Sequence, residues 1–186
     1  MKWLIASDLH GDADGAARLI EAFRREGASR LVLLGDILYH GPRNGLPEHY
    51  DPKETAAILN RERRHTVSVR GNCDSEVDQM MLEFPILADY ALIALGERTV
   101  FATHGHVYNT ENVPPMARGD VLLCGHTHVP ACETFGDDLH YLNPGAVSFP
   151  KNGSPRSYMT FEDGVFVWKT LEGEKYRTFE VKGYCE

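Results

Sequence analysis

Cysteine is scarce in this chain of 186 residues, and the four cysteines form no CxxC pair and no zinc-ribbon spacing. A disulfide framework is therefore not expected, and reduced thiols in the cytosol are the simplest interpretation. Long apolar runs are absent too: no stretch approaches the ~20 apolar residues that span a bilayer. Residues 1–7 reach Asp8 before a signal-peptide apolar segment can form. We therefore expect a cytoplasmic protein that has no contact with a membrane.

Positive charge is also in short supply, because 19 Lys and Arg residues stand against 27 Asp and Glu residues, giving −8 with His counted neutral. A surface of that sign disfavours the coating of nucleic acid. Apolar residues make up 42% and charged residues 25%, which is typical of a folded chain rather than a disordered or collagen-like one. The length suits a single domain over residues 1–186 that buries a full core without disulfides.

Short apolar strands alternate with helices in the first half of the chain. Asp51 as a cap, Pro52 at the first helical position and Glu54 in the first turn are a clear helix start. The resulting order of strand, helix, strand, helix, strand implies a largely parallel sheet with right-handed crossovers. The predicted strands are 3–6, 30–34 and 66–69, and the predicted helices are 13–26, 52–64 and 75–84.

After Pro85 the pattern changes to consecutive short strands separated by turn residues. Because consecutive strands without helices cannot all be parallel, we expect a second, mainly antiparallel sheet. The two sheets are expected to pack on one another with the helices outside. The predicted strands of this half are 91–95, 99–103, 121–124, 131–135, 139–142, 158–161, 165–171 and 176–181.

Polar side chains follow five of the predicted strands at the point where each strand ends. The carboxyl ends of parallel strands converge on one edge of an open sheet, so these segments should meet there. Residues two apart at a strand end project to the same side, which pairs Asp8 with His10 and His126 with His128. The five segments are Asp8-Leu9-His10, Gly35-Asp36, Gly71-Asn72-Cys73-Asp74, His104-Gly105-His106 and Gly125-His126-Thr127-His128.

This set combines carboxylate, amide and imidazole groups, which suit a divalent ion such as Mn²⁺, Fe²⁺ or Zn²⁺. Seven ligands are too many for one ion, and they serve two ions only if one ligand is shared. A carboxylate can bridge, so either Asp8 or Asp36 is the natural shared ligand. Two ions ~3.5 to 4 Å apart hold a hydroxide and clamp a phosphoryl group. The residues therefore predict metal-assisted hydrolysis of a phosphoester.

The same motifs, in this order, resemble the calcineurin-like metallophosphoesterase superfamily. The matches run from Asp8 to His128, and residues 143–148 resemble a further segment of the family. Residues 35–44 and 71–79 are similar to its small bacterial single-domain branch, the YfcE-type phosphodiesterases. The resemblance implies an α/β (α+β sandwich) fold with two packed mixed β-sheets flanked by helices, in four-layer αββα order. It also implies a phosphodiesterase that acts on a small or activated phosphoester.

The resemblance further implies which side chains hold two divalent ions. Mn²⁺ is the expected metal, with Fe²⁺, Zn²⁺ and Ni²⁺ as alternatives, and a homo-oligomer, either a dimer or a tetramer, is expected by likeness to the family. One ion would be held by Asp8, His10, Asp36 and His128, and the second by Asp36, Asn72, His104 and His126, with Asp36 bridging.

One position departs from the family pattern. Many members have His directly after the metal-binding Asn, where it is thought to protonate the leaving group, and here that residue is Cys73. A thiol with a pKa near 8.5 is a poorer acid than imidazolium. Either His106 or His40 donates the proton, or the substrate has an acidic leaving group. We therefore expect Asp36, Asn72, Cys73 and His106 in the catalytic centre.

Several neighbouring residues have two interpretations. His106 could act in catalysis or only orient its neighbours. His40 and Arg43 lie on the loop after Asp36, where either could bind the substrate, and Arg43 could instead be a solvated surface residue. Asp12 suits a helix start better than a metal site, and Asp74 suits a supporting contact or a cap better than a ligand. The remaining histidines and cysteines are expected to be structural, exposed or inert: His49, His65, His140, Cys124, Cys132 and Cys185.

Two other functions stay open from the residues alone. The chain could be a binding scaffold that keeps the fold with weak or no catalysis, which Cys73 would suit. A dimetal site could also hydrolyse a phosphomonoester or a nucleotide pyrophosphate. The intact set of converging polar residues argues against the scaffold, because a scaffold has no physical need for it.

Overall fold

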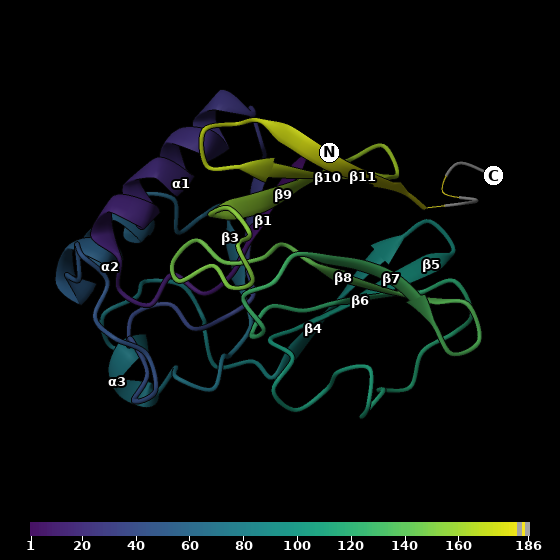
Figure 1. The fold of residues 1–186 in the computed structure, drawn as a ribbon, viewed down its shortest axis with the longest axis horizontal. Helices are drawn as coiled ribbons and strands as arrows, with labels where there is room; N and C mark the ends of the chain where they lie inside the picture. The colour runs from purple at the N-terminus through teal and green to yellow at the C-terminus, as the bar shows by residue number, and fades with distance from the viewer. Residues whose placement is uncertain (182–183, 185–186) are drawn as a thin grey trace.

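The computed structural model describes residues 1–181 and Tyr184, and its strands form two sheets that pack face to face (Figure 1). In the described part, the first sheet contains β1 (Trp3–Ala6), β2 (Arg30–Leu33), β3 (Thr66–Ser68), β9 (Ser157–Glu162), β10 (Val165–Thr170) and β11 (Lys175–Glu180). The second contains β4 (Tyr90–Leu95), β5 (Arg98–Thr103), β6 (Val121–Leu123), β7 (Ala131–Phe135) and β8 (Leu139–Asn143). The helices are α1 (Ala13–Arg25), α2 (Pro52–Asn60) and α3 (Glu76–Gln79).

Each sheet contains both parallel and antiparallel strand pairs, which agrees with the predicted fold of two packed mixed sheets. In the first, with order β11-β10-β9-β1-β2-β3, strands β1, β2 and β3 run parallel, whereas β9 pairs antiparallel with β1. In the second, with order β4-β5-β6-β8-β7, β6 runs parallel to both β5 and β8. The prediction that the later strands form a mainly antiparallel second sheet is therefore wrong. Strands β9, β10 and β11 join the first sheet instead. In the second sheet, β7 lies between β6 and β8 in the chain and forms a hairpin with β8, which allows β6 and β8 to run parallel.

Apolar side chains form a layer on each side of the first sheet. Leu4, Leu33 and Leu19 belong to the cluster that joins this sheet to the helices, and α1 and α2 lie together beside it (Figure 1). Ile5 and Trp168 belong to the cluster between the two sheets. The outer face of the second sheet carries a third, smaller cluster that contains Phe101, Leu122 and Cys124, with Tyr108 and Met116 packed against it. Over the described residues 104–120, which cover this face, the chain forms no helix.

The helix starts follow the predicted capping residues. The Asp12 carboxylate accepts a hydrogen bond from the Gly15 amide, and the Asp51 carboxylate accepts from the amides of Lys53 and Glu54. Because α2 ends at Asn60 and turns follow, its predicted end near Arg64 is wrong. Among the described residues no helix is long and apolar enough to cross a bilayer.

The predicted helix over 75–84 is much shorter than expected. It is present as α3, with Ser75 and Asp78 forming a capping box, and it ends at Gln79. The Gln79 side-chain amide group donates to the carbonyl oxygens of Leu82 and Phe84 and accepts from the Ile86 amide. These contacts lie beyond the end of α3, and both Val77 within the helix and Met80 at its C-cap are exposed.

Candidate metal centre

Loops that follow β1, β2, β3, β5 and β6 bring all the predicted ligands to one edge of the two sheets. Their side chains contact one another across large sequence distances, for example His10 with His128 and His104 with Asn72. Asp8, His10, Asp36, His104 and His128 are buried, whereas Asn72 is exposed. The convergence expected from the strand ends is therefore present.

Most of these residues have a left-handed backbone, a conformation that L-residues rarely adopt. The φ angles are 58° at Asp8, 51° at His10, 55° at Asp36, 67° at His126 and 61° at His128. Each such residue costs of order 1 kcal/mol and persists only where its surroundings hold it. The paired residues therefore meet through turned loops beyond the strand ends, and not through the alternation of an extended strand.

Asp8, His10 and His128 form one cluster of ligand atoms. The Nε2 atom of His128 lies 3.3 Å from Oδ1 of Asp8. The Nε2 atom of His10 lies 3.3 Å from Nε2 of His128 and 3.7 Å from Oδ1 of Asp8. Three ligand atoms this close together, from one carboxylate and two imidazoles, match the needs of a divalent transition-metal ion.

His104, His126 and Asn72 form a second cluster beside the first. The Nε2 atom of His104 lies 3.1 Å from Oδ1 of Asn72 and 3.2 Å from Nδ1 of His126. Asp36 connects the two clusters, since its Oδ2 atom lies 3.5 Å from Nε2 of His104 and 3.7 Å from Nε2 of His10. One carboxylate oxygen thus faces an imidazole of each cluster.

Backbone carbonyl groups orient three of the imidazole rings. The Nδ1 atoms of His10, His104 and His128 lie 2.9, 2.6 and 2.8 Å from the carbonyl oxygens of Tyr39, Leu34 and Phe149. A carbonyl oxygen can only accept, so each Nδ1 carries the proton and donates it. In the neutral ring, the lone pair of Nε2 then faces the centre, which is the usual arrangement of a metal-binding histidine.

The carboxylates are held in place by backbone amides. Oδ1 of Asp36 accepts from the Cys73 amide at 2.8 Å, and Oδ2 of Asp8 accepts from the His126 amide at 3.0 Å. The Asp74 carboxylate accepts from the amides of Asp36, Ile37 and Gly71. Asp74 therefore supports Asp36, as one of its two interpretations predicted, while Ser75 is the helix cap.

One buried atom of this centre is left without a hydrogen-bond donor. Oδ1 of Asp8 is fully buried and has no hydrogen-bond partner among the described residues, although burial of an unpaired carboxylate oxygen is costly. In the neutral rings, which are the form that binds a metal, the nearby Nε2 atoms are lone-pair acceptors and supply no donor. A cation would satisfy all of these atoms, so the residues present fit the divalent ions that the sequence predicts.

The charges of the centre shift several pKa values in the metal-free protein. Burial raises the pKa of Asp8, but contacts with His10 and His128 outweigh it and hold this pKa well below its usual range. Burial lowers the pKa of His104, yet the carboxylates of Asp36 and Asp8 raise it to about 9. The pKa of His126 falls to about 4 because of burial and the neighbouring charge of His104. The carboxylates thus stay ionised and ready to bind a cation.

A cavity of about 660 Å³ opens over the centre. Cys73 faces it, and burial together with the charge of Asp36 raises the pKa of the Cys73 thiol. Arg43 also lines it, whereas His40 and His106 do not. His106 instead lies beside the rings of His104 and His126, and His40 packs against Tyr39 and Tyr50. The two alternative proton donors therefore lie outside the cavity lining.

Six described residues of this cavity lining have no role assigned from the sequence: Tyr39, Gly41, Pro42, Asn44, Thr127 and Lys151. Thr127 lies between two predicted ligands, so its position was available from the motif. Lys151 lies on an irregular loop after β8, and its amide donates to the His128 carbonyl oxygen at 3.1 Å. No periodicity or motif marks such a residue, and only the folded loop brings it to the site.

The remaining histidines and cysteines lie away from the centre. Cys124 belongs to the third apolar cluster, and Cys132 packs against the inter-sheet cluster, as predicted for inert thiols. His65 pairs with Glu62, and His140 contacts Phe179. Cys185 lies outside the described residues.

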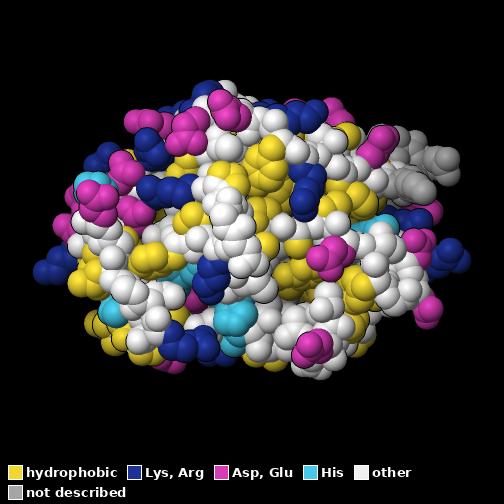
Figure 2. Space-filling model, in the orientation of Figure 1, with side chains coloured by type: hydrophobic (Ala, Val, Ile, Leu, Met, Phe, Trp, Pro, Cys, Tyr) yellow, Lys and Arg dark blue, Asp and Glu magenta, His cyan; other side chains and the backbone are white. Residues whose placement is uncertain are grey.

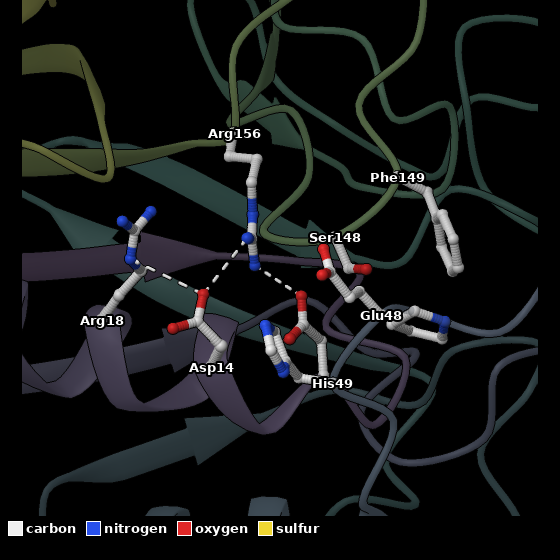
Figure 3. A pocket seen from close by; sticks show the side chains of 9 residues that line it. Asp14, Arg18, Glu48, His49, Ser148, Phe149 and Arg156 are labelled. Carbon is white, nitrogen blue, oxygen red and sulfur yellow. Dashed lines mark hydrogen bonds and ion pairs between the residues drawn. The ribbon is translucent and has the colours of Figure 1, made fainter.

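A second cavity of about 360 Å³ lies beside the start of α1 and is lined by none of the predicted ligands. Figure 3 shows Arg156 and Arg18 both directed toward Asp14. Arg156 also pairs with Asp12 at 2.5 Å. The charges that line this cavity are therefore largely paired within the protein.

Comparisons with known proteins agree with these features. Residues 1–163 match the family model of the calcineurin-like phosphoesterase superfamily domain. The chain is 48% identical to phosphodiesterase YfcE of Escherichia coli strain K12 over 165 residues, which cover 89% of each protein. It matches a solved structure of the E. coli phosphoesterase YfcE with a TM-score of 0.94 and 43% identity, over 98% of this chain and 100% of that one. A solved archaeal phosphodiesterase shares the fold, with a TM-score of 0.60 and 20% identity, over 97% of this chain and 99% of that one.

Proposed function

Since this chain belongs to the calcineurin-like phosphoesterase superfamily and is a phosphoric ester hydrolase, we propose that it is a phosphodiesterase with two divalent metal ions in its site. Its substrate is a small phosphodiester or one with an activated leaving group. Mn²⁺ is the ion that we propose first, because oxygen and imidazole ligands together suit it.

The position of Asp36 carries this proposal. Its Oδ2 atom lies 3.5 Å from Nε2 of His104 in one cluster and 3.7 Å from Nε2 of His10 in the other. A carboxylate oxygen placed between two ligand clusters is what a bridging ligand requires. We propose that Asp8, His10, Asp36 and His128 hold one ion, and that Asp36, Asn72, His104 and His126 hold the other.

Bound together, two divalent ions would supply an activated hydroxide and stabilise the negative charge of the phosphoryl oxygens. The chain itself positions these groups. The Nδ1 atoms of His10, His104 and His128 donate to backbone carbonyl oxygens, so the Nε2 atom of each neutral ring is directed toward the metal site. The amides of Cys73 and His126 hold one oxygen each of Asp36 and Asp8, which fixes the direction of the other oxygen.

Cys73 explains why an activated leaving group is proposed. Its thiol faces the cavity, and its raised pKa keeps the proton on sulfur at neutral pH. Such a group is a weak general acid. His40 and His106 do not line the cavity, whereas Cys73 does, so we propose neither imidazole as the proton donor. Substrates whose leaving group departs as a stable anion are therefore favoured.

Hydrolysis of bis(p-nitrophenyl) phosphate tests the proposal. Protein treated with a chelator should have no turnover, and added Mn²⁺ should restore it, whereas Asp36→Ala should stay inactive while folding normally. Crystals grown with Mn²⁺ should show two anomalous peaks that share Asp36. Absence of metal-dependent turnover, or full activity of Asp36→Ala, would refute the proposal. Turnover of phosphomonoesters in preference to diesters would favour the monoesterase alternative.

We also propose a compartment, a class of partner and an oligomeric state for the enzyme. We propose that it acts in the cytoplasm on small phosphoesters, that it does not coat nucleic acid or bind membranes, and that it assembles as a dimer or tetramer. The chain has net charge −8, and Cys73, Cys124 and Cys132 are unpaired thiols, which is consistent with a reducing compartment.

A further inference from the structure

Two basic side chains line the large cavity beside the predicted ligands. Arg43 comes from the loop after β2, and Lys151 comes from the loop after β8. Both are exposed, and neither forms an ion pair with any residue in the described part of the chain. Among the described residues of the lining, Asp36 is the one acidic side chain, and it faces the ligand clusters. The cavity therefore holds two uncompensated positive charges in a chain of net charge −8.

The second cavity provides a contrast within the same protein. There Arg18 pairs with Asp14 and Glu172, and Arg156 pairs with Asp12 and Asp14. On the face in Figure 2, Lys and Arg side chains lie directly beside exposed His side chains in the lower half. Unpaired cations that share a cavity with the proposed metal centre are thus free to contact a molecule bound there.

The size of the cavity indicates that this partner is not the scissile phosphate alone. A volume of about 660 Å³ is in the range that encloses a drug-sized ligand, and it far exceeds a single phosphoryl group. Tyr39, which is 40% exposed, adds an aromatic face to the same lining. An aromatic face of this kind can stack on a base or an aryl group.

We propose that Arg43 and Lys151 bind a second anionic group of the substrate, so that the favoured substrates are phosphodiesters that also carry a phosphate monoester. This inference rests on the proposed function, because it assigns the scissile phosphate to the centre at Asp36. Two cations match the charge of a phosphate monoester, which is about −1.5 to −2 at pH 7. Arg43 can bind such a group through two parallel hydrogen bonds, and Lys151 adds a point charge.

A pair of substrates with the same leaving group tests the inference. One is the p-nitrophenyl ester of thymidine 5′-phosphate, and the other is the same compound with an additional 3′-phosphate. The Mn²⁺-loaded enzyme should favour the second compound at least ~10-fold in kcat/KM, mainly through a lower KM, and less so as ionic strength rises. Equal values of kcat/KM for the two compounds would overturn the inference.

Substitutions then assign the preference to the two side chains. In the double variant Arg43→Gln with Lys151→Gln, the ratio between the two compounds should fall to within about 2-fold, since neutral side chains cannot balance the additional phosphate. Lys53→Gln is the matched control, because Lys53 is exposed on α2 and does not line the cavity. A preference that survives in the double variant, or that is lost equally in the control, would also overturn the inference.

A binding measurement separates this inference from the proposed function. Calorimetric titration of chelator-treated protein with thymidine 3′,5′-bisphosphate should give an affinity that falls at least ~10-fold in the double variant and stays constant in Lys53→Gln. Equal affinities in the double variant and the parent would contradict the inference. If the parent protein with Mn²⁺ shows no turnover of bis(p-nitrophenyl) phosphate, the proposed function itself is contradicted.

Discussion

Arg156 and Asp12 form an ion pair that joins the loop before β9 to the first turn of α1. The two side chains are 30% and 7% exposed, and Nε of Arg156 also donates to the Val147 carbonyl oxygen at 2.6 Å. The segment that begins at Val147 then supports the centre. Its Ser148 amide donates to the Asp8 carbonyl oxygen, and its Phe149 carbonyl oxygen accepts from Nδ1 of His128. Arg156 is thus in a position to act on two predicted ligands without touching either.

Replacing Arg156 by Met should therefore affect both stability and metal binding. Asp12 would lose its partner but keep its charge, and since Arg156 is 30% exposed, urea unfolding should show a loss of about 2 kcal/mol, less than for a fully buried pair. Calorimetry should also show weaker binding of Mn²⁺, because the Phe149 carbonyl oxygen would no longer hold the His128 ring in a fixed direction. Arg18→Met is the control: its pair with Glu172 is exposed, so it should cost under ~1 kcal/mol. Unchanged Mn²⁺ affinity in Arg156→Met would show that Arg156 is only structural.

The approach of Gly71 to Asp36 predicts a second effect. A Cβ atom added at Gly71 would lie 2.1 Å from Oδ1 of Asp36 and 2.3 Å from its amide nitrogen, so Asp36 would have to move. We expect Gly71→Ala to lower kcat on bis(p-nitrophenyl) phosphate about 100-fold, since a small misplacement of a reacting group has an effect of that size. Gly45→Ala should be neutral, because nothing lies within 4 Å of its added Cβ and its φ is not positive. Activity of Gly71→Ala equal to that of Gly45→Ala would contradict the proposed role of Asp36.

The residues of the site could be predicted from the sequence, but the geometry that holds them could not. Polar residues at strand ends are visible in the one-dimensional pattern, so the convergence of Asp8, His104 and His128 could be predicted. The left-handed backbone at Asp8 and His128 depends on the surrounding loops, which no local pattern specifies. Lys151 is similar, since its loop reaches the cavity only because β8 and β9 lie in different sheets.

The fold shows the same division between local and long-range information. Ranges of the strands and the start of each helix follow from apolar periodicity and capping residues, which act within a few residues of one another. The pairing of β9 with β1 joins residues more than 150 positions apart, such as Leu4 and Thr160, so the strands alone do not reveal it. The early end of α3 depends on the Gln79 side chain, whose contacts with Leu82 and Ile86 compete with the helix.

Metal binding should release protons. In the metal-free protein, burial lowers the pKa of His104, but the Asp36 and Asp8 carboxylates raise it to about 9, so the ring carries a second proton at pH 7. A metal-binding imidazole must lose that proton. The affinity for Mn²⁺ should therefore rise between pH 6 and pH 8, about tenfold per pH unit for each proton released. Calorimetry in buffers of different ionisation enthalpy measures the proton number, and a value of zero would contradict this protonation state.

Glu26 should make folding sensitive to acid. Its carboxylate accepts hydrogen bonds from Lys169 at 2.7 Å and Tyr158 at 2.8 Å and pairs with Lys2 at 3.0 Å, and its side chain is 8% exposed. Burial raises its pKa, but the two lysines outweigh this and lower it to about 2 from 4.5. The ionised group therefore stabilises the fold fully above pH 4.5, and this contribution is lost as the pH falls toward 2.

Glu26→Gln should accordingly cost about 2 kcal/mol at pH 7, and the difference from the parent should shrink as the pH falls from 4.5 toward 2. Denaturant unfolding of both proteins across this range measures it. The control Glu83→Gln removes a pair with Arg63 in which both side chains are exposed, so it should change little at any pH. A cost of Glu26→Gln that is independent of pH would show that packing, and not charge, holds this residue.

Replacing Cys73 by His should change which substrates are hydrolysed well. The thiol faces the cavity and keeps its proton, because burial and the Asp36 carboxylate raise its pKa. An imidazole with a pKa nearer 7 is a better general acid and can contribute ~100-fold or more. That gain is available only where the leaving group needs a proton, so kcat on an alkyl phosphodiester should rise at least ~10-fold more than kcat on bis(p-nitrophenyl) phosphate.

Cys132→His is the control for cysteine replacement, since Cys132 packs against the inter-sheet cluster away from the cavity. An equal change on both substrates in Cys73→His would mean that this position does not act in proton transfer.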